Sequence, residues 1–208
     1  MKIAVIGTGN AEGTLGSHWA EGGYEIIFDT RDMSSDRVKT LLKSAGQNAR
    51  ATGVREAAAA ANVVVFAVLW AAAQDVIRSA GDFVGKVVID CMNPIGEHGL
   101  TIGLTTSAVE QVATWTEGAR VVKAFNTIGF QNSADPIYGA QSVTMFICGD
   151  DIEAKTVVSE LTDVLGFEVC DIGPLYTARY LEPLAMLWVH LVYAEGLGPN
   201  IVFKLIKH

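Results

Sequence analysis

Short apolar runs alternate with stretches of helical spacing along most of the chain. The run at residues 3–6 is too short for a helix and ends at Gly7, which is typical of a buried parallel strand. Strands that alternate with helices indicate a Rossmann-type, doubly wound α/β fold with a mostly parallel sheet. Further apolar runs predict strands at residues 24–28, 63–68, 86–90, 120–124, 143–148 and 167–171.

The stretches between these strands have the spacing of helices. Leu15 and Trp19 lie four positions apart in the first, at residues 13–22, so both are expected to face the core. Ser34 or Ser35 can cap a second helix that runs to about residue 45. The remaining helices are expected at residues 57–61, 71–80 and 151–165.

The pattern changes after Gly173. Large apolar residues fill a helical stretch at 175–197, which Pro183 is expected to break, and a last short helix is expected at 201–207. These residues exceed the single stripe that one buried helix face needs, which indicates a partner surface. We therefore expect a NAD(P)-binding Rossmann domain at 1–173 and a C-terminal helical segment at 174–208 for dimerisation or substrate binding, in a homodimer.

A glycine-rich turn joins the first strand to the first helix. Gly7 permits the sharp turn, and Gly9 lets the backbone approach a pyrophosphate, which the helix N-terminus attracts. The third glycine of the usual motif would fall at Glu12, and Gly13 follows instead. A turn of this kind between a strand and a helix predicts dinucleotide binding. The alternative is a plain strand–helix turn.

The end of the second strand predicts which dinucleotide binds. An acidic residue there holds the ribose hydroxyls of NAD, whereas an arginine accommodates the 2′-phosphate of NADP. The acidic position falls at Thr30 and Arg31 follows, so we expect NADP(H) to be preferred over NAD(H). The alternative is that Arg31 is a solvated surface residue. Asp29 adds a negative charge one residue away, which strand alternation is expected to turn to the other side.

Composition narrows the function classes. The net charge of −8 makes the chain a poor partner for nucleic acid or an anionic membrane. The 3 cysteines and 4 histidines lack metal-ligand spacing, so no metal site is expected. The sequence starts directly with a strand, and no apolar run reaches about 18 residues without charges or turn signals. We expect a cytoplasmic protein with no signal peptide and no membrane contact.

Several longer segments resemble a known family. The segments are "IAVIGTGN", "TRD", "VVVFAVLW", "VVIDCMNPI", "VVKAFNTIG", "MFICGDD" and "GPLYTARYLEPLAMLWVHL", and together they span nearly the whole chain. With them the chain resembles the NADP oxidoreductases that depend on a deazaflavin coenzyme. It is also similar to the cytosolic oxidoreductase domain of the six-transmembrane metalloreductases. "DCMNP" and "KAFNT" are more specific than the glycine loop, because both lie at predicted strand ends.

The resemblance implies hydride transfer and a role for each strand end. Asn93 and Asn126 could equally be turn residues, and Phe125 could equally pack in the core. The chain departs from the family at Glu12, at Asp29 and at Leu69, where proline is common. The implied cofactor contacts are Gly7, Thr8, Gly9, Asn10 and Ala11 at the pyrophosphate; Thr30 and Arg31 at the 2′-phosphate; Val68, Leu69 and Trp70 beside the adenosine and ribose; and Asn93, Pro94, Ala124, Phe125 and Asn126 around the nicotinamide.

No residue is assigned as a catalytic proton donor. Hydride transfer between two cofactors needs alignment rather than acid–base help. His190 and Glu182 share a helix face, but His190 is expected in the core or at an interface, and Lys123 is expected to extend to solvent. One open function is an NADPH-dependent reductase of a flavin-like or deazaflavin acceptor, or of a small imine or carbonyl compound. The other is a non-catalytic NAD(P) sensor.

Overall fold

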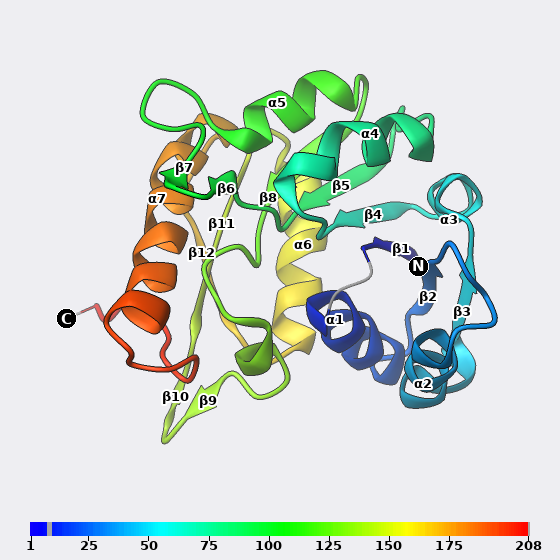
Figure 1. Ribbon diagram of the computed structural model, residues 1–208, viewed down its shortest axis with the longest axis horizontal. Coiled ribbons are helices and arrows are strands. Elements are labelled where there is room, and N and C mark those ends of the chain that lie inside the picture. Colours follow the sequence, from blue (N-terminus) through cyan, green and yellow to red (C-terminus); the bar gives the residue numbers. More distant parts are fainter. Residues whose placement is uncertain (8–9, 208) are drawn as a thin grey trace.

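A mixed sheet forms the centre of the molecule. The computed structural model describes residues 1–7 and 10–207, without the side chains of 10–12, 130 and 131, and the main sheet of this part has eight strands in the order β12-β11-β8-β5-β4-β1-β2-β3 (Figure 1). The strands are β1 (Lys2–Ile6), β2 (Glu25–Asp29), β3 (Ala49–Thr52), β4 (Val63–Phe66), β5 (Val87–Asp90), β8 (Arg120–Lys123), β11 (Thr144–Gly149) and β12 (Glu168–Asp171).

The strands from β3 to β8 are parallel, and their order is that of a Rossmann fold. β11 runs antiparallel to β8, and β12 pairs with β11 in parallel. The prediction of a Rossmann-type, mostly parallel α/β sheet is therefore confirmed.

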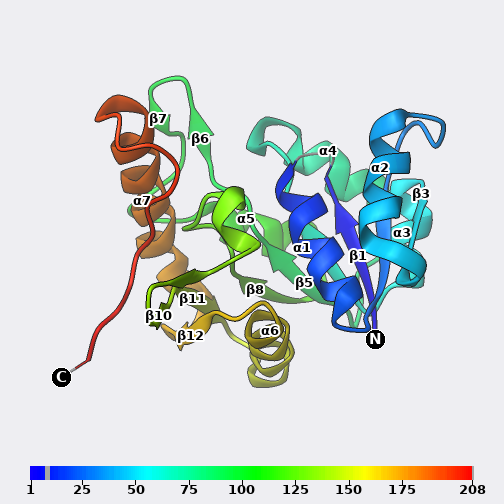
Figure 2. The ribbon, with the colours of Figure 1, turned by 90° about the horizontal axis from the view of Figure 1, so that it is seen from below.

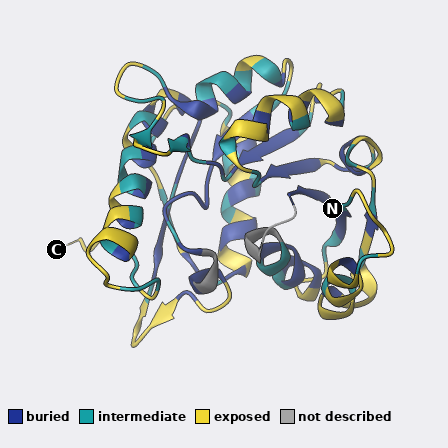
Figure 3. Ribbon diagram, in the orientation of Figure 1, coloured by how far each residue is buried: buried dark blue, intermediate teal, exposed yellow. Residues whose placement is uncertain are grey.

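Helices cover both faces of the sheet. Buried side chains of α1 (Asn10–Glu21), α2 (Asp36–Ala45) and α6 (Ile152–Val164) pack on one face. Those of α3 (Val54–Ala60), α4 (Trp70–Ala80), α5 (Ala108–Trp115) and α7 (Ala178–Val189) pack on the other. Figure 2 shows these layers from a second side, and Figure 3 shows buried central strands beneath helices with exposed outer faces.

The first helix packs closely because of one glycine. A side chain at Gly16 would place its Cβ 2.4 Å from Cε1 of the Phe28 ring on β2, so only glycine fits there. Leu15 and Trp19 are buried as predicted, and the Trp19 indole N–H donates to the Leu161 carbonyl over 2.9 Å. Gly16, rather than Gly13, thus provides the close helix–strand contact expected of the third motif glycine.

Capping residues mark the starts of α2 and α6 and the end of α2 at positions that the sequence predicts. The Ser35 hydroxyl accepts a hydrogen bond from the Val38 N–H, and Gly46 ends α2 with a φ of 72°. Asp151 caps α6 by accepting from the Ala154 N–H over 2.7 Å.

Some elements were not predicted. β3 has the sequence Ala-Arg-Ala-Thr and lies at the edge of the sheet. It was missed because it contains no large apolar residue. α5 begins with a capping box that could have been noticed, since Ser107 and Glu110 bond reciprocally. Two short hairpins were also missed, β6 (Ile95–Gly96) with β7 (Gly99–Leu100), and β9 (Ile137–Tyr138) with β10 (Gln141–Ser142). Single helical turns occur at Gly46–Asn48, Phe130–Ser133 and Leu175–Thr177.

Two predictions for the C-terminal segment are wrong. Pro183 lies inside α7 and does not break it, because buried Leu181, Glu182 and Ala185 hold the helix against the core. A π-helical stretch, His190–Ala194, continues it.

The expected helix at 201–207 is instead an extended segment. It follows β11, where the Thr144 N–H donates to the Phe203 carbonyl and the Leu205 N–H donates to the Thr144 hydroxyl.

Candidate functional site

The polar and glycine positions predicted from the sequence meet at one edge of the sheet. Because the parallel strands all end there, the sheet order places five residues in a row after β8, β5, β4, β1 and β2, namely Asn126, Asn93, Val68, Gly7 and Thr30. With about 4.8 Å between neighbouring strands, this row is about 19 Å long. A ligand extended along the row would contact every strand end, as dinucleotides do in this fold.

The phosphate end of the row, around β1 and β2, contains an open cavity of about 640 Å3. Gly7 lines it with a φ of 148°, which a residue with a side chain would adopt only under strain. Thr8 and Gly9 lie outside the described residues. Asn10 and Ala11 form the first turn of α1, and their side chains, like that of Glu12, are also outside the description.

A smaller cavity of about 220 Å3 adjoins it at the end of β2. Thr30 and Arg31, two of the predicted cofactor residues, line this cavity, and so do Ser35 and Arg37 from the start of α2. The sequence reasoning missed Arg37, whose signal was a second arginine near the N-terminus of the helix that follows. Two guanidinium groups and two hydroxyl groups suit a phosphate monoester.

Asp29 contradicts its prediction. Its side chain lines both cavities instead of turning away, because its Oδ1 accepts a hydrogen bond from the Gly7 N–H over 2.6 Å. Burial raises the pKa of the Asp29 carboxyl, although this hydrogen bond and the charge of Arg31 act in the opposite direction. Two acidic residues, Asp29 and Asp32, therefore line the smaller cavity together with the two arginines.

The wall of the larger cavity comes from β4 and α4. Val68 and Leu69, which the family resemblance places beside the adenosine and ribose, both line it, with Leu69 83% exposed. Trp70 is not part of this wall, because its ring stacks on Trp115 with 5.3 Å between ring centroids. Four lining residues on one face of α4 were missed, although their helical spacing was visible in the sequence: Ala72, Asp75, Val76 and Ser79.

At the other end of the row, Asn93 and Asn126 bond to each other. The Asn93 side-chain amide donates to the Asn126 carbonyl over 2.8 Å, and the Asn126 amide donates to the Asn93 Oδ1 over 3.0 Å. The Asn126 amide also donates to the Leu181 carbonyl at the start of the Pro183-containing turn of α7. Since both partners of the Asn126 nitrogen are acceptors, the orientation of this amide is fixed.

One acceptor atom in this pair has no partner. The Asn126 Oδ1 is buried and accepts no hydrogen bond from the described residues, while Asn126 as a whole is only 5% exposed. Such an atom costs free energy unless a ligand or water donates to it. A carboxamide N–H, like that of nicotinamide, would supply the missing donor, so these residues fit the cofactor that the sequence predicts.

The neighbours of this pair have more ordinary roles. Phe125 has a φ of 60°, but its ring packs in the core against Trp19 and Phe167, which agrees with the core alternative. Ala124 and Pro94 are buried beside the asparagines.

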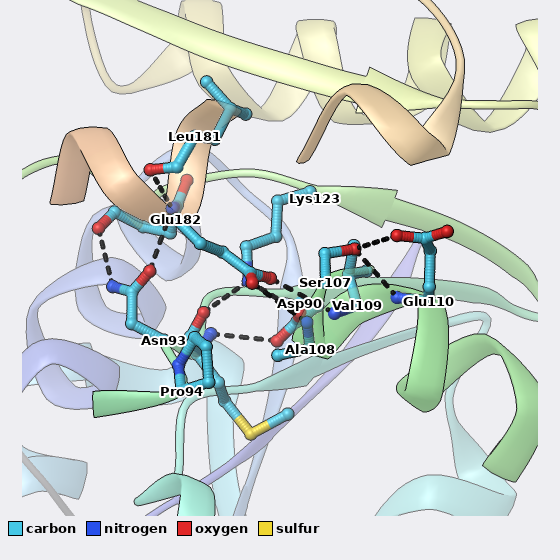
Figure 4. Close-up of polar contacts among 12 residues, drawn as sticks. Asp90, Asn93, Pro94, Ser107, Ala108, Val109, Glu110, Lys123, Leu181 and Glu182 are labelled. Carbon is cyan, nitrogen blue, oxygen red and sulfur yellow. Dashed lines mark hydrogen bonds and ion pairs between the residues drawn. The ribbon is translucent and has the colours of Figure 1, made fainter. Parts of the chain in front are cut away.

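A fully buried ion cluster lies next to the asparagines (Figure 4). The Lys123 ammonium is 2.9 Å from the Asp90 Oδ2 and 3.1 Å from the Glu182 Oε1, and all three side chains are without solvent exposure. The expectation that Lys123 reaches solvent is therefore wrong. Burial alone would lower the pKa of Lys123, but the two carboxylates raise it above its usual value.

The two candidate proton donors, Glu182 and His190, have different surroundings in the structure. Glu182 is held in the ion cluster, whereas His190 is about half exposed and pairs with Glu195 over 3.1 Å, so His190 is not a core residue. In the described part of the chain, no group of three histidine, cysteine or acidic side chains could hold a metal ion. Among the same residues, no helix has the length and apolar character needed to cross a membrane.

Comparison with known proteins shows the family to which the chain belongs. The model of the family "NADP oxidoreductase coenzyme F420-dependent" matches residues 2–94. A solved structure from Arthrobacter sp. FB24, described there as a candidate F420-dependent NADP reductase, is 31% identical, covers 100% of both chains and superposes with a TM-score of 0.90. The chain belongs to this family. Members of this family are NADP-dependent oxidoreductases.

Two curated relatives show how far the likeness to other members extends. The F420-dependent NADP reductase of Methanocaldococcus jannaschii is 26% identical, over 98% of this chain and 94% of its own length. Metalloreductase STEAP3 of Rattus norvegicus is 31% identical over 89% of this chain. This chain spans only 37% of STEAP3, so the likeness concerns one part of that protein.

Proposed function

We propose that the chain is an NADPH-dependent oxidoreductase that transfers a hydride between NADP(H) and a flavin-like or deazaflavin acceptor. The observation that carries the proposal is the continuous row of strand ends, with a pocket of two arginines at one end and an unpartnered buried amide oxygen at the other. Membership of an NADP oxidoreductase family and the name of its F420-dependent members support it.

Each part of the row would hold one part of the dinucleotide. Thr30, Arg31 and Arg37 would bind the 2′-phosphate, and the α4 wall would flank the adenosine. Asn126 would accept a hydrogen bond from the carboxamide. When bound, NADPH supplies a hydride, and the acceptor takes that hydride and one proton from solvent. The protein's own part is to align two rings and exclude water, which requires no protein acid.

Cofactor preference tests the phosphate pocket. We expect Arg31→Ala to weaken NADPH binding about tenfold, the scale of one charge-assisted contact, and to leave NADH binding unchanged. Lys43→Ala, which removes a positive charge from the far end of α2, is the matched control and should change neither. Calorimetric titration measures both cofactors. An equal loss for NADPH and NADH would refute the assignment of this pocket to the phosphate.

A panel of acceptors tests the reaction. NADPH is mixed with the protein and, separately, a deazaflavin, FMN, FAD, a cyclic imine and a small ketone, while the dihydronicotinamide absorbance is followed. Oxidation with the deazaflavin or flavins supports the proposal. Oxidation only with the imine or ketone favours a reductase of such compounds, and binding without any oxidation favours a sensor.

We also propose that two copies of the chain associate through the C-terminal segment. Large apolar side chains on α7 and after it are exposed, including Tyr180, Leu187, Tyr193 and Leu197. Exposed apolar surface of this extent favours a partner, and a second copy supplies the same surface. Sedimentation at micromolar concentration tests this: a monomer would refute it.

A further inference from the structure

The buried ion cluster carries more negative than positive charge. It contains one cation, Lys123, and two carboxylates, Asp90 and Glu182, all inaccessible to solvent. Three backbone N–H groups donate further hydrogen bonds to the two carboxylates. The Asp90 Oδ1 accepts from the Met92 N–H over 2.9 Å, and Glu182 accepts from the N–H groups of Ala108 and Val109 over 2.9 and 3.2 Å. In each of these contacts the carboxyl oxygen is the acceptor, as it is in a carboxylate.

The cluster therefore has a net charge of about −1. Lys123 stays protonated, because the two carboxylates raise its pKa against the opposing effect of burial. The N-terminus of α5, whose N–H groups bond to Glu182, offsets part of this negative charge, because a helix N-terminus carries about half a positive charge. The remaining negative charge has no access to water, which would otherwise screen it.

This charge lies directly behind the proposed nicotinamide site. The Met92 carbonyl accepts a hydrogen bond from Lys123, and the next residue along the chain is Asn93. The Leu181 carbonyl accepts from the Asn126 side chain, and the next residue is Glu182. The cluster and the asparagine pair are thus joined at two points, one through β5 and one through α7, as Figure 4 shows for the labelled residues.

We propose that the Asp90–Lys123–Glu182 cluster selects the redox state of the bound cofactor by favouring the cationic oxidised ring of NADP+ over the neutral ring of NADPH. The inference rests on the proposed function, because it needs a nicotinamide at this end of the row. The two cofactor forms differ by one positive charge on the ring, which is the part nearest the cluster. Tighter binding of NADP+ also makes bound NADPH a stronger hydride donor than free NADPH.

Two substitutions remove one negative charge each from different elements. Glu182→Gln changes a residue of α7 and Asp90→Asn a residue of β5, and both substitutions nearly preserve the shape of the side chain. The ratio of the dissociation constant for NADP+ to that for NADPH is measured by calorimetric titration. We expect this ratio to rise about three- to tenfold in each variant, the scale of one charge interacting across a poorly screened interior. Glu117→Gln, on an exposed residue before β8, is the matched control and should leave the ratio unchanged.

The ratio separates electrostatics from a merely structural role. A variant that only displaces the asparagines would weaken both cofactor forms by the same factor, and an unchanged ratio in a folded variant would overturn the inference. If neither variant folds, the unsubstituted protein decides, because tighter binding of NADPH than of NADP+ would overturn it. Failure of the unsubstituted protein to bind either form would instead refute the proposed function, and with it the cluster's role.

Discussion

The two ends of the strand-end row are built in opposite ways. At the phosphate end, Arg31 and Arg37 are exposed around open cavities, and Arg37 forms no ion pair with any described carboxylate. At the nicotinamide end, Lys123, Asp90 and Glu182 are wholly buried and already paired. The difference shows that one fold can hold charge in two forms, as solvated cations around a cavity and as a buried ion cluster.

This contrast follows from the cost of burying charge. An exposed arginine keeps its hydration until a phosphate replaces it, so the free protein loses little stability. A buried lysine is stable only while its carboxylates remain, and removing one partner leaves an uncompensated charge. We call the phosphate end, with Arg31 and Arg37, the open end, and the nicotinamide end, with Lys123, Asp90 and Glu182, the closed end. Substitutions at the open end should therefore lower cofactor affinity, whereas substitutions at the closed end should lower the stability of the protein.

The largest effect is expected from removing the buried cation. Lys123→Met leaves two fully buried acidic side chains without their cation, which should lower the free energy of unfolding by about 3–5 kcal/mol. Denaturant unfolding measures this loss. Lys39→Met removes a lysine from an exposed pair with Asp36 on α2 and should cost less than about 1 kcal/mol. Similar losses for the two variants would break the contrast between buried and exposed charge.

A smaller loss is expected in the scaffold under the phosphate end. Gly16→Ala drives a methyl group into the Phe28 ring, so α1 must move from β2 at a cost of about 1–3 kcal/mol. NADPH affinity should fall with it, because α1 begins with Asn10 and Ala11, which the family resemblance places at the pyrophosphate. Gly103→Ala is the control, since a Cβ there meets Leu100 at an ordinary 3.8 Å and should change stability by less than about 0.5 kcal/mol. Equal stability of the two variants would show that α1 is not packed this closely.

The open end was largely predictable from sequence. Gly7 follows an apolar run, and Thr30 and Arg31 follow the second strand, so local spacing alone placed them in the pocket. Arg37 could have been added, because it lies in the first turn of a helix that Ser35 already indicated. Asp29 was misplaced because alternation along a strand does not hold at its last residue, where the side chain can turn to cap the Gly7 N–H.

The closed end was less predictable. Asn93 and Asn126 were named only through the family resemblance, and their mutual hydrogen bonds join residues 33 positions apart. Lys123 was expected in solvent because a lone lysine gives no sign of its partners. Those partners are Asp90, on a neighbouring strand, and Glu182, which arrives from α7 far along the chain. Contacts between elements that lie far apart in the chain produce no local pattern in the sequence, so they cannot be predicted from periodicity.

A substitution of the second arginine tests whether the open end binds the 2′-phosphate. Arg37→Ala should weaken NADPH binding about fivefold, less than Arg31→Ala, because Arg37 reaches the cavity from α2 rather than from the end of β2 and its exposed side chain remains solvated. Stability should stay within about 0.5 kcal/mol of the unsubstituted protein. Titration with NADPH and NADH measures the effect. A loss of NADH binding of the same size would mean that Arg37 does not contact the 2′-phosphate.

The smallest effect is expected at Asp29, where the open end holds one partly buried charge. Asp29→Asn keeps an oxygen to accept the Gly7 N–H but removes the carboxylate from beside the two arginines. NADPH should then bind up to about threefold tighter, because a repulsion with the 2′-phosphate is lost. Titration at neutral pH measures the gain, and weaker binding would show that the charge itself holds the loop in shape.

The same substitution has a pH signature whose sign follows from burial. Burial raises the pKa of Asp29 in the folded protein above its unfolded value, so the folded state favours the protonated form. The stability that Asp29 contributes is therefore fully present below the unfolded pKa and is lost as pH rises through the folded pKa. Asp29→Asn should accordingly be the more stable protein at neutral pH and lose that advantage near about pH 4, as denaturant unfolding at the two pH values would measure. An advantage that grows toward acid pH would mean that the Gly7 hydrogen bond and Arg31 outweigh burial, and that this carboxylate belongs with the paired charges of the closed end.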